Sequence, residues 1–364
     1  MRITLDATPL LGARTGVGQY VQHLVAELPA AIARRDLDAE VRATTWTARG
    51  SRLTDLPQEV AQVGPRVPAR LLRELWRRGD HPRIETLVGR TEVFHGTNFT
   101  SPPTHRAREV VTIHDLTYVL HRSTVSSASV LYQELVPRAL ARGAHVVTPS
   151  HAVAAEVAAF YDLDTSRVTA TPLGVELDWF DATPASPAWL STHGLPTDYL
   201  VFVGSLDPRK NLPTLLAAHS QLRAEHPDTP ALVLAGPAGR EASLANRAGL
   251  HLTGWLSTPD LQALVAGARA LVLPSIDEGF GLPVIEALAT GRPVVTSDIP
   301  ALREVGGPHA VVADALDPAS LATALSDALQ LADGPVDRAR RREWARRFSW
   351  SAFADRTLDA YLAS

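Results

Sequence analysis

The chain has 364 residues, of which 45% are hydrophobic and 20% are charged. This length and composition are typical of a soluble globular protein with two domains of ordinary size. A formal net charge of -4 argues against a nucleic-acid-binding surface, and the lack of cysteine excludes disulfides, thiolate zinc sites and cysteine nucleophiles. The first residues lack the basic-then-apolar pattern of a secretory signal, and no window resembles a membrane span, so we expect a cytoplasmic protein.

Short runs rich in Val, Ile and Leu alternate with helical patterns along the first half of the chain. Strands are expected at 2–7, 41–47, 92–95, 109–114, 145–149 and 168–172, and helices at 17–33, 69–78, 126–142 and 151–161. This alternation predicts a parallel sheet covered by helices on both faces. We assign residues 1–174 to an N-terminal domain.

The composition changes at 175–198. This segment is rich in Pro, Asp, Ser and Gly and is expected to be an interdomain linker. The alternation then restarts, with strands expected at 200–204, 231–236, 251–255, 270–274, 293–296 and 310–312. We therefore predict an α/β protein with two Rossmann-like, doubly wound parallel-sheet domains facing a central cleft. The second domain covers 199–348, and 349–364 forms a helix that crosses back to the first. Ligands of such sheets lie at the carboxyl ends of the strands, where the motifs should be sought.

The strongest motif, at 277–291, follows the strand ALVLPS directly. Pro283 and Gly291 bound a short helix, and Gly279 and Gly281 leave the backbone N–H groups before it open to a ligand. The helix dipole adds partial positive charge there, which suits a diphosphate. Phe280 and Leu282 belong to the same turn.

Two glutamates flank this turn, Glu278 in the loop and Glu286 on the helix. Carboxylates accept paired hydrogen bonds from the vicinal diols of a pyranose or a ribose. The alternative is that Glu278 is a helix-entry acid and Glu286 a solvated surface residue. The glycines, the proline and the position after a strand favour the functional interpretation.

Arg209 and Lys210 stand in the text VFVGSLDPRKNLPTLLAAH, at the entrance of a helix that begins near Asn211. Cations there oppose the helix dipole unless an anion lies between them. We therefore expect these side chains to bind a diphosphate, the alternative being two solvated side chains.

In the first half, Gly16 and Gly18 begin a helix after the first strand and are expected to approach the phosphates of a bound ligand. His114 and Asp115 come directly after the strand EVVTI. Asn98 is a candidate for the acceptor pocket or a loop cap, and Asp115 is a candidate for the same pocket. A lone histidine is usually structural, which is the default interpretation for His95, His145 and His251.

Arginines recur over 66–90 among Leu71, Leu72, Leu75 and Trp76. Such a basic amphipathic helix can rest on an anionic bilayer and present the protein to a lipid-linked acceptor, or it can simply be solvated. The pairs Asp36–Asp38 and Asp162–Asp164 follow helices rather than strands, so we expect polar connectors there and no metal or other cofactor.

The stretch EGFGLPVIEALATGRPVVTSDIPALREV resembles the retaining GT-B glycosyltransferases of family four, group 1, which include bacterial mannosyltransferases. The resemblance implies that Glu278 and His114 contact the transferred sugar and that Glu286 contacts the donor ribose. It also implies that Arg209 and Lys210 bind the donor diphosphate. Some relatives carry arginine where Ser205 stands here. Trp255 and Leu256, in HLTGWLS, resemble the region flanking the nucleobase, and a core position for Trp255 is the alternative.

The resemblance further implies that residues 1–174 bind the acceptor and residues 199–348 bind the nucleotide sugar. It also implies a metal-independent reaction that retains the anomeric configuration. The expected donor is GDP-mannose, and the expected acceptor is a glycan, a glycolipid or another hydroxyl compound of polysaccharide assembly. A transferase that uses UDP- or dTDP-sugars on small molecules remains an alternative. So do a sugar-nucleotide epimerase and a non-catalytic nucleotide-sugar-binding protein, although the charged site residues are all present.

Overall fold

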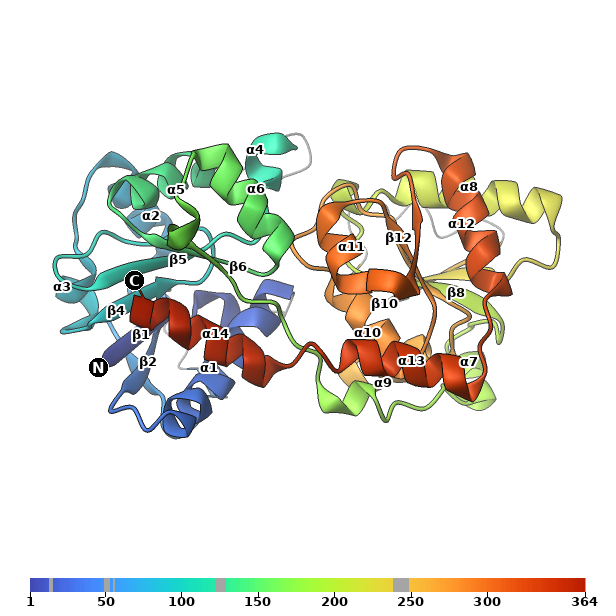
Figure 1. The fold of residues 1–364 in the computed structure, drawn as a ribbon, viewed down its shortest axis with the longest axis horizontal. Coiled ribbons are helices and arrows are strands. Elements are labelled where there is room, and N and C mark those ends of the chain that lie inside the picture. The colour runs from blue at the N-terminus through green and yellow to red at the C-terminus, as the bar shows by residue number, and fades with distance from the viewer. Residues whose placement is uncertain (13–15, 49–52, 55, 122–128, 238–248, 364) are drawn as a thin grey trace. The chain divides into compact units, whose positions relative to one another are not determined.

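The computed structural model describes residues 1–12, 16–48, 53–54, 56–121, 129–237 and 249–363 (Figure 1). The chain divides into two compact units. Unit 1 comprises Met1–Gly174 and Ser349–Ser364, and unit 2 comprises Val175–Phe348. Each unit is built around its own parallel sheet and is described by itself.

The sheet of unit 1 has seven parallel strands within the described residues, in the order β3-β2-β1-β4-β5-β6-β7. The strands are β1 Arg2–Asp6, β2 Glu40–Thr44, β3 Ala61–Val63, β4 Val93–Gly96, β5 Arg108–Thr112, β6 His145–Thr148 and β7 Val168–Ala170. Most strand residues are buried, as expected for a sheet covered on both faces. The sequence prediction missed β3, because three residues are too short to show a periodicity.

The helices of unit 1 include two that the sequence predicted with the same bounds, α2 and α6. The full set is α1 Gly16–Arg34, α2 Ala69–Arg78, α3 Ile84–Val88, α4 Thr117–Leu120, α5 Tyr132–Ala141, α6 His151–Tyr161 and α14 Trp350–Ala363. Single 3-10 turns lie at η1 Thr8–Leu10, η3 Ser129–Leu131 and η4 Thr165–Arg167. Helix α14 packs along α1 and buries Phe353 and Tyr361 in unit 1. The start of the predicted helix 126–142 falls partly outside the described residues.

The described part of unit 2 has a six-stranded parallel sheet in the order β10-β9-β8-β11-β12-β13. The strands are β8 Tyr199–Val203, β9 Ala231–Ala235, β10 Leu250–Gly254, β11 Leu271–Leu273, β12 Val294–Ser297 and β13 Ala310–Ala313. The helices are α7 Pro187–Thr192, α8 Leu212–Glu225, α9 Thr258–Gly267, α10 Leu282–Thr290, α11 Pro300–Gly306, α12 Pro318–Gln330 and α13 Pro335–Ala345. Single turns lie at η5 Leu177–Trp179, η6 Pro208–Lys210 and η8 Gly307–His309.

The segment 175–198, expected to be a linker, instead folds onto unit 2 and carries η5 and α7. The Ala185 amide donates to the Ala263 carbonyl at 3.0 Å, and Trp189 Nε1 donates to the Asp260 carboxylate at 3.0 Å. Trp179 is buried as well. The buried apolar residues of 175–198 are too widely spaced to show a periodicity, which is why the sequence suggested a linker.

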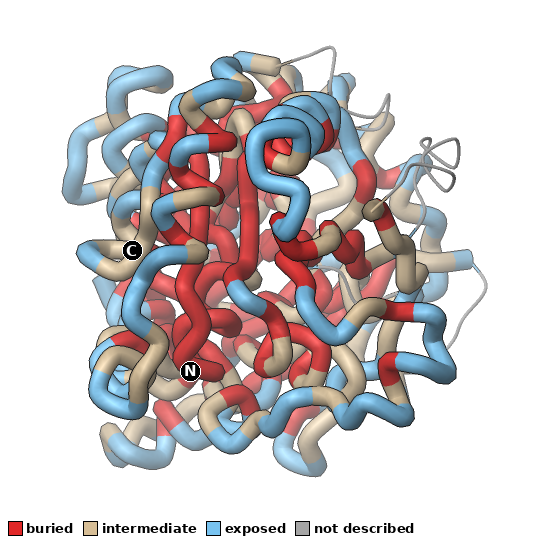
Figure 2. Tube along the Cα trace, turned by 90° about the vertical axis from the view of Figure 1, so that its right-hand side faces the viewer, coloured by how far each residue is buried: buried red, intermediate tan, exposed pale blue. Residues whose placement is uncertain are grey.

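Buried residues follow the strands, while the outward faces of the helices are exposed (Figure 2). Helix α10 is an exception, because all its residues but Pro283 are buried. A helix that is apolar on all sides belongs in the interior of its domain, and α10 packs against α9, α11 and α13. Its one acidic residue, Glu286, is therefore held within the protein.

Both sheets reverse their strand order at one point, between β1 and β4 in unit 1 and between β8 and β11 in unit 2. The connections on the two sides of such a point run to opposite faces, which leaves a crevice at the carboxyl ends of the two central strands. The loops that follow β8 and β11 are therefore the first place to look for a ligand site in unit 2.

A substitution at Gly236, directly after β9, tests how tightly the carboxyl edge of this sheet is packed. A Cβ atom there would lie 2.0 Å from the Gly204 carbonyl oxygen, and the φ angle of +148° disfavours side chains. We expect Gly236→Ala to lower the free energy of unfolding by about 1–3 kcal/mol, measured by urea unfolding. Gly79→Ala is the control, since its added Cβ meets nothing within 4 Å. Equal stability of the two variants would contradict the close packing.

Candidate active site

Two loops are tied together at the reversal point of unit 2. The Ile276 amide donates to the Arg209 carbonyl at 2.9 Å, and Asn211 Nδ2 donates to the Pro274 carbonyl at 3.1 Å. Asn211 has a left-handed backbone with φ of 56°, a conformation that asparagine tolerates better than most residues. Thr214 Oγ1 holds its side-chain oxygen at 2.7 Å. Asn211 thus fixes the loop that carries the two predicted cations, a role that the sequence analysis did not assign.

Glu278 lies between these two cations. Arg209 Nη1 donates to Glu278 Oε2 at 3.0 Å, and Lys210 Nζ donates to Oε1. Ser275 Oγ donates to Oε1 at 2.7 Å. The side chains of Lys210 and Glu278 are only 9% and 7% exposed, so this is a buried ion pair. The structure therefore brings together three residues that the sequence placed on separate motifs.

The electrostatics of this cluster keep the glutamate ionised. Burial alone would raise the pKa of Glu278, but the charges of Lys210 and Arg209 and the hydrogen bonds to the carboxylate lower the pKa to about 2. Burial lowers the pKa of Lys210, and the facing carboxylate opposes this effect. Arg209, Lys210 and Glu278 together carry one net positive charge. A site of this kind favours an anionic ligand.

The predicted helix after Glu278 is present as α10, whose first residue is Leu282. Gly281 precedes it with φ of 97°, and Gly291 ends it with φ of 86°, both in the left-handed region that favours glycine. The first amides of a helix have no partner within the helix and can bind an anion. The Phe280 side chain is buried and meets Phe348 edge-on, so only its backbone is available to a ligand.

Glu286 is buried, so the alternative of a solvated surface residue is wrong. Among the described residues its carboxyl group has no hydrogen bond or ion pair, and burial, together with the nearby charge of Glu176, raises the pKa of Glu286 to about 8. The residue keeps 8% of its surface exposed, so a ligand hydroxyl that reaches the carboxyl could supply the missing hydrogen bond. Glu176 went unnoticed in the sequence because it lies in the supposed linker.

The other predicted donor residues of unit 2 do not join the cluster. Ser205 Oγ donates to the Asp207 carboxylate, on the loop after β8. Trp255 directly follows β10 and is 59% exposed, which rules out the core position considered for it. Leu256 beside it is partly buried. An exposed indole at the carboxyl edge of the sheet is suited to stacking, and its contact with a base stays a prediction.

In unit 1, His114 follows β5 and is buried. Its Nε2 lies 2.9 Å from the Thr97 carbonyl, so this nitrogen carries the proton and donates. Tyr20 and Phe99 meet the ring edge-on. Burial lowers the pKa of His114, which leaves the ring neutral with Nδ1 as an acceptor. Its contact with a sugar stays a prediction.

The structural interpretation of two other histidines agrees with their contacts. His95 is bonded through Nδ1 to the Tyr361 hydroxyl at 2.6 Å and through Nε2 to the Thr112 hydroxyl at 2.7 Å. His145 Nε2 lies 2.8 Å from the Thr169 hydroxyl. Both rings serve the packing of unit 1.

The candidate acceptor residues Asn98 and Asp115 lie around one side chain, Tyr132 of α5. Asn98 is hydrogen-bonded to Tyr132, whose pKa is raised chiefly by burial, and Asp6, Asp115 and Arg73 lie close enough to influence it. Asp6 ends β1 and is buried. The structure thus gathers polar groups from the ends of β1, β4 and β5. Asp6 could have been found by the same criterion that pointed to His114, its position at the end of a strand.

Helix α1 begins at Gly16, and a Cβ atom there would meet nothing within 4 Å. Gly18 is buried in the first turn. The preceding residues 13–15 lie outside the described residues, and an approach of this loop to phosphates stays a prediction.

Both acidic pairs considered for a metal stand at helix ends. Asp36 and Asp162 have left-handed backbones after α1 and α6, and Asp164 accepts from the Ser166 amide at 2.8 Å. These contacts are those of polar connectors. In the part of the chain that the structure describes, no group of three or more His, Asp or Glu side chains is arranged to hold a metal ion.

Two family profiles together match most of the chain. Residues 14–179 match "Glycosyltransferase Family 4", and residues 197–331 match "Glycosyl transferases group 1". The chain is 29% identical to the O-antigen chain mannosyltransferase B of Escherichia coli over 99% of each chain. It is also 30% identical to the MMP alpha-(1->4)-mannosyltransferase of Mycolicibacterium hassiacum, over 63% of this chain and 56% of that protein.

The fold also matches solved structures. WaaG, a glycosyltransferase involved in lipopolysaccharide biosynthesis, superposes with a TM-score of 0.66 over 100% of both chains at 16% identity. The two doubly wound sheets are therefore those of the GT-B fold, which confirms the predicted fold class. The chain belongs to glycosyltransferase family four.

The raised pKa of Glu286 predicts a pH-dependent stability. An unfolded glutamate ionises above about pH 4.5, whereas the folded one stays protonated to about pH 8. Folding therefore takes up a proton in this window, and stability falls as pH rises through it, by up to about 1.4 kcal/mol per pH unit. Glu286→Gln cannot ionise at this position. Between pH 5.5 and 7.5, the free energy of unfolding measured with urea should therefore fall by about 2–3 kcal/mol more in wild type than in the variant. Parallel pH profiles would contradict this.

Proposed function

We propose that this family-four glycosyltransferase transfers mannose from GDP-mannose to a hydroxyl of a glycan or glycolipid in polysaccharide assembly. The reaction retains the anomeric configuration and needs no metal ion or other cofactor, the nucleotide sugar being a co-substrate. The names of the two relatives support mannose, and the family resemblance supports retention. Guanine as the base rests on the resemblance to mannosyltransferases alone.

The observation that carries this proposal is the pairing of Glu278 with Arg209 and Lys210 at the reversal point of unit 2. A diphosphate brings the negative charge that two clustered cations are suited to bind. The backbone amides at the start of α10, which follows the neighbouring strand β11, add partial positive charge. Ionised Glu278, held beside these cations, then accepts hydrogen bonds from hydroxyls of the sugar attached to the diphosphate.

The chemistry needs charge stabilisation more than a nucleophile. The bond between the anomeric carbon and the diphosphate oxygen breaks, and its electron pair leaves with the diphosphate. The acceptor oxygen bonds to the same face of the sugar, and its proton passes to the leaving diphosphate. Arg209 and Lys210 stabilise the negative charge that develops, and the carboxylate of Glu278 stabilises the positive charge on the sugar ring.

The second glutamate, Glu286, binds the ribose of the donor. Glu286 is a buried carboxyl with no described partner, and ribose hydroxyls can supply the hydrogen bonds it lacks. Trp255, exposed at the carboxyl edge of the same sheet, is placed for stacking on the base. These assignments give each part of a nucleoside diphosphate sugar a partner in unit 2.

Donor binding is tested by thermal unfolding with GDP-mannose, GDP, UDP-glucose and UDP. A ligand at 100 times its Kd adds about 2.7 kcal/mol of apparent stability, and we expect this from the GDP compounds. Glu278→Gln removes the negative charge that Arg209 and Lys210 share, so GDP should bind at least as tightly while transfer falls about 10²- to 10³-fold. Glu225→Gln, at an exposed glutamate that ends α8, is the matched control and should stay active. Weaker GDP binding by Glu278→Gln would overturn the assigned pairing.

We also propose that α2 rests on an anionic membrane surface, which would bring the enzyme to a lipid-linked acceptor. Among the described residues no helix is both long and apolar enough to span a bilayer. Leu71 and Leu75 of α2 are 52% and 39% exposed at adjacent turns, and Arg70 is exposed beside them. Arg77 and Arg78 are paired with Glu74, so the exposed leucines contribute more to this surface than the sequence suggested.

Sedimentation with vesicles of 30% anionic lipid tests this contact. We expect wild type to pellet at low salt and the double variant Leu71→Glu, Leu75→Glu to lose about 10-fold in vesicle affinity, because carboxylates repel the anionic surface. Leu331→Glu, an exposed leucine of unit 2, is the control. Equal binding by the double variant would refute the contact without bearing on donor binding.

A further inference from the structure

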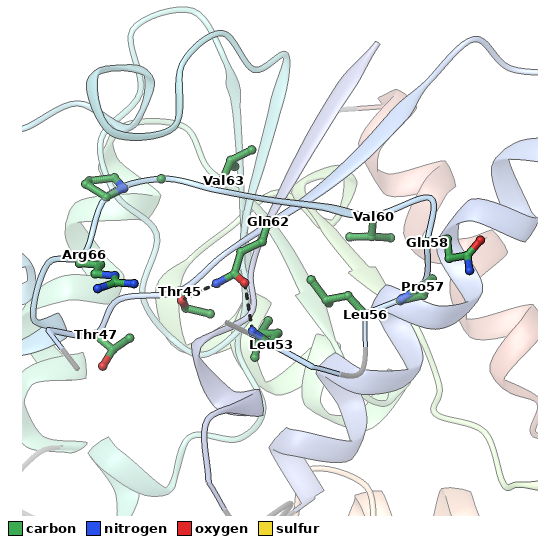
Figure 3. Close-up of a pocket in the computed structure, with 12 residues that line it drawn as sticks. Thr45, Thr47, Leu53, Leu56, Pro57, Gln58, Val60, Gln62, Val63 and Arg66 are labelled. Carbon is green, nitrogen blue, oxygen red and sulfur yellow. Dashed lines mark hydrogen bonds between the residues drawn. The ribbon is translucent and has the colours of Figure 1, made fainter. Parts of the chain in front are cut away.

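A pocket of about 540 Å³ lies in unit 1, outside the polar cluster around Tyr132. It opens where β2 and β3 end, between Thr45 and Thr47 on one strand end and 62–66 on the other (Figure 3). The rest of the described lining comes from Leu53, Leu56, Pro57, Gln58 and Val60. None of these residues belongs to a motif that the sequence analysis identified, apart from Arg66 in the basic stretch.

The pocket is held open by a hydrogen-bonded glutamine. Gln62 Nε2 donates to Thr45 Oγ1 at 3.2 Å, and the Leu53 amide donates to Gln62 Oε1 at 3.0 Å (Figure 3). This side chain therefore ties Leu53 to the strand ends on both sides.

The lining combines polar and apolar groups in a way that suits carbohydrate. Arg66 and Thr47 lie at one end in Figure 3, and Gln58 lies at the other. Leu56 and Val60 provide apolar surface between them. Hydroxyl, amide and guanidinium groups bind sugar hydroxyls, and the C–H faces of sugar rings pack on aliphatic side chains.

The same lining disfavours other ligands. Among the described lining residues, none is aromatic or acidic, and one, Arg66, is a cation. A nucleotide would use an aromatic platform and several cations, and a lipid chain would need a mainly apolar lining. An uncharged or weakly anionic glycan fits the groups that are present.

The position of the pocket along the sheet sets the size of that glycan. The pocket lies at the ends of β2 and β3, while His114 follows β5, and the strand order between them is β2-β1-β4-β5. Three strand spacings correspond to about 14 Å. A monosaccharide is too short to reach from one place to the other, whereas a chain of several sugars can.

We propose that this pocket binds a sugar of an oligosaccharide acceptor, several residues away from the sugar that receives the transferred hexose. The proposal rests on the function proposed above and adds to it that the acceptor is an already extended glycan. The pocket holds the far part of that chain, Arg66 and Gln58 bind its hydroxyls, and the polar groups around Tyr132 face the near part.

Binding to an array of immobilised glycans, from one to six sugars long and including mannose oligosaccharides, tests the proposal. Wild type should bind chains of three or more sugars and not the matching monosaccharides. Arg66→Ala and Gln58→Ala should each weaken binding of the long chains by roughly 10-fold, the effect of losing one or two hydrogen bonds. Arg106→Ala, at an exposed arginine just before the amino end of β5 and outside the pocket lining, should bind like wild type.

The outcomes separate the pocket from the proposed function. Binding of GDP-mannose is measured on the same samples by thermal unfolding, and both pocket variants should keep it, because they lie in unit 1. If wild type binds no glycan, or monosaccharides as well as longer chains, or if both variants keep full affinity, the pocket proposal is overturned while donor binding stands. Failure to bind any nucleotide sugar, with glycan binding intact, refutes the proposed function instead.

Discussion

The carboxylate of Glu278, shared between Lys210 and Arg209, is the interaction on which the candidate site of unit 2 depends. Removing a carboxylate and an ammonium from water is expensive, and a buried pair is tolerated only when further hydrogen bonds complete it. Ser275 supplies one of these, and Asn211 locks the neighbouring loop to the end of β11. The loops after two central strands therefore have one defined arrangement, with one net positive charge among these three side chains.

The doubly wound sheet explains why such groups meet. Parallel strands bring all their carboxyl ends to one edge, so residues far apart in the chain become neighbours if each directly follows a strand. Unit 1 obeys the same rule with different chemistry. Asp6, Asn98 and Asp115 gather around Tyr132 from three strand ends, and they lack the paired cations of unit 2. The two units thus differ in their charged groups, because two cations share one carboxylate in unit 2, whereas two carboxylates and Arg73 lie near Tyr132 in unit 1.

The sequence predicted the elements well, because buried parallel strands and bounded helices leave strong periodicities. It also placed Glu278 in a loop after a strand and Arg209 and Lys210 at the entrance of a helix. It could not show that these three side chains pair with one another, since a pairing across 68 residues leaves no local trace. The burial of Glu286 was missed for a similar reason. A helix that is apolar all round shows no face, and only packing by α9, α11 and α13 reveals that its glutamate is enclosed.

These two environments give the two glutamates opposite protonation states around neutral pH. Cations hold the pKa of Glu278 near 2, whereas burial beside Glu176 raises that of Glu286 to about 8. Two carboxyl groups separated by one helical turn and a short loop can therefore act differently, one as an anion and the other as a hydrogen-bond donor. An anion suits the side of a sugar that becomes positively charged. A neutral carboxyl can both donate to and accept from a diol, and it adds no repulsion toward a diphosphate bound nearby.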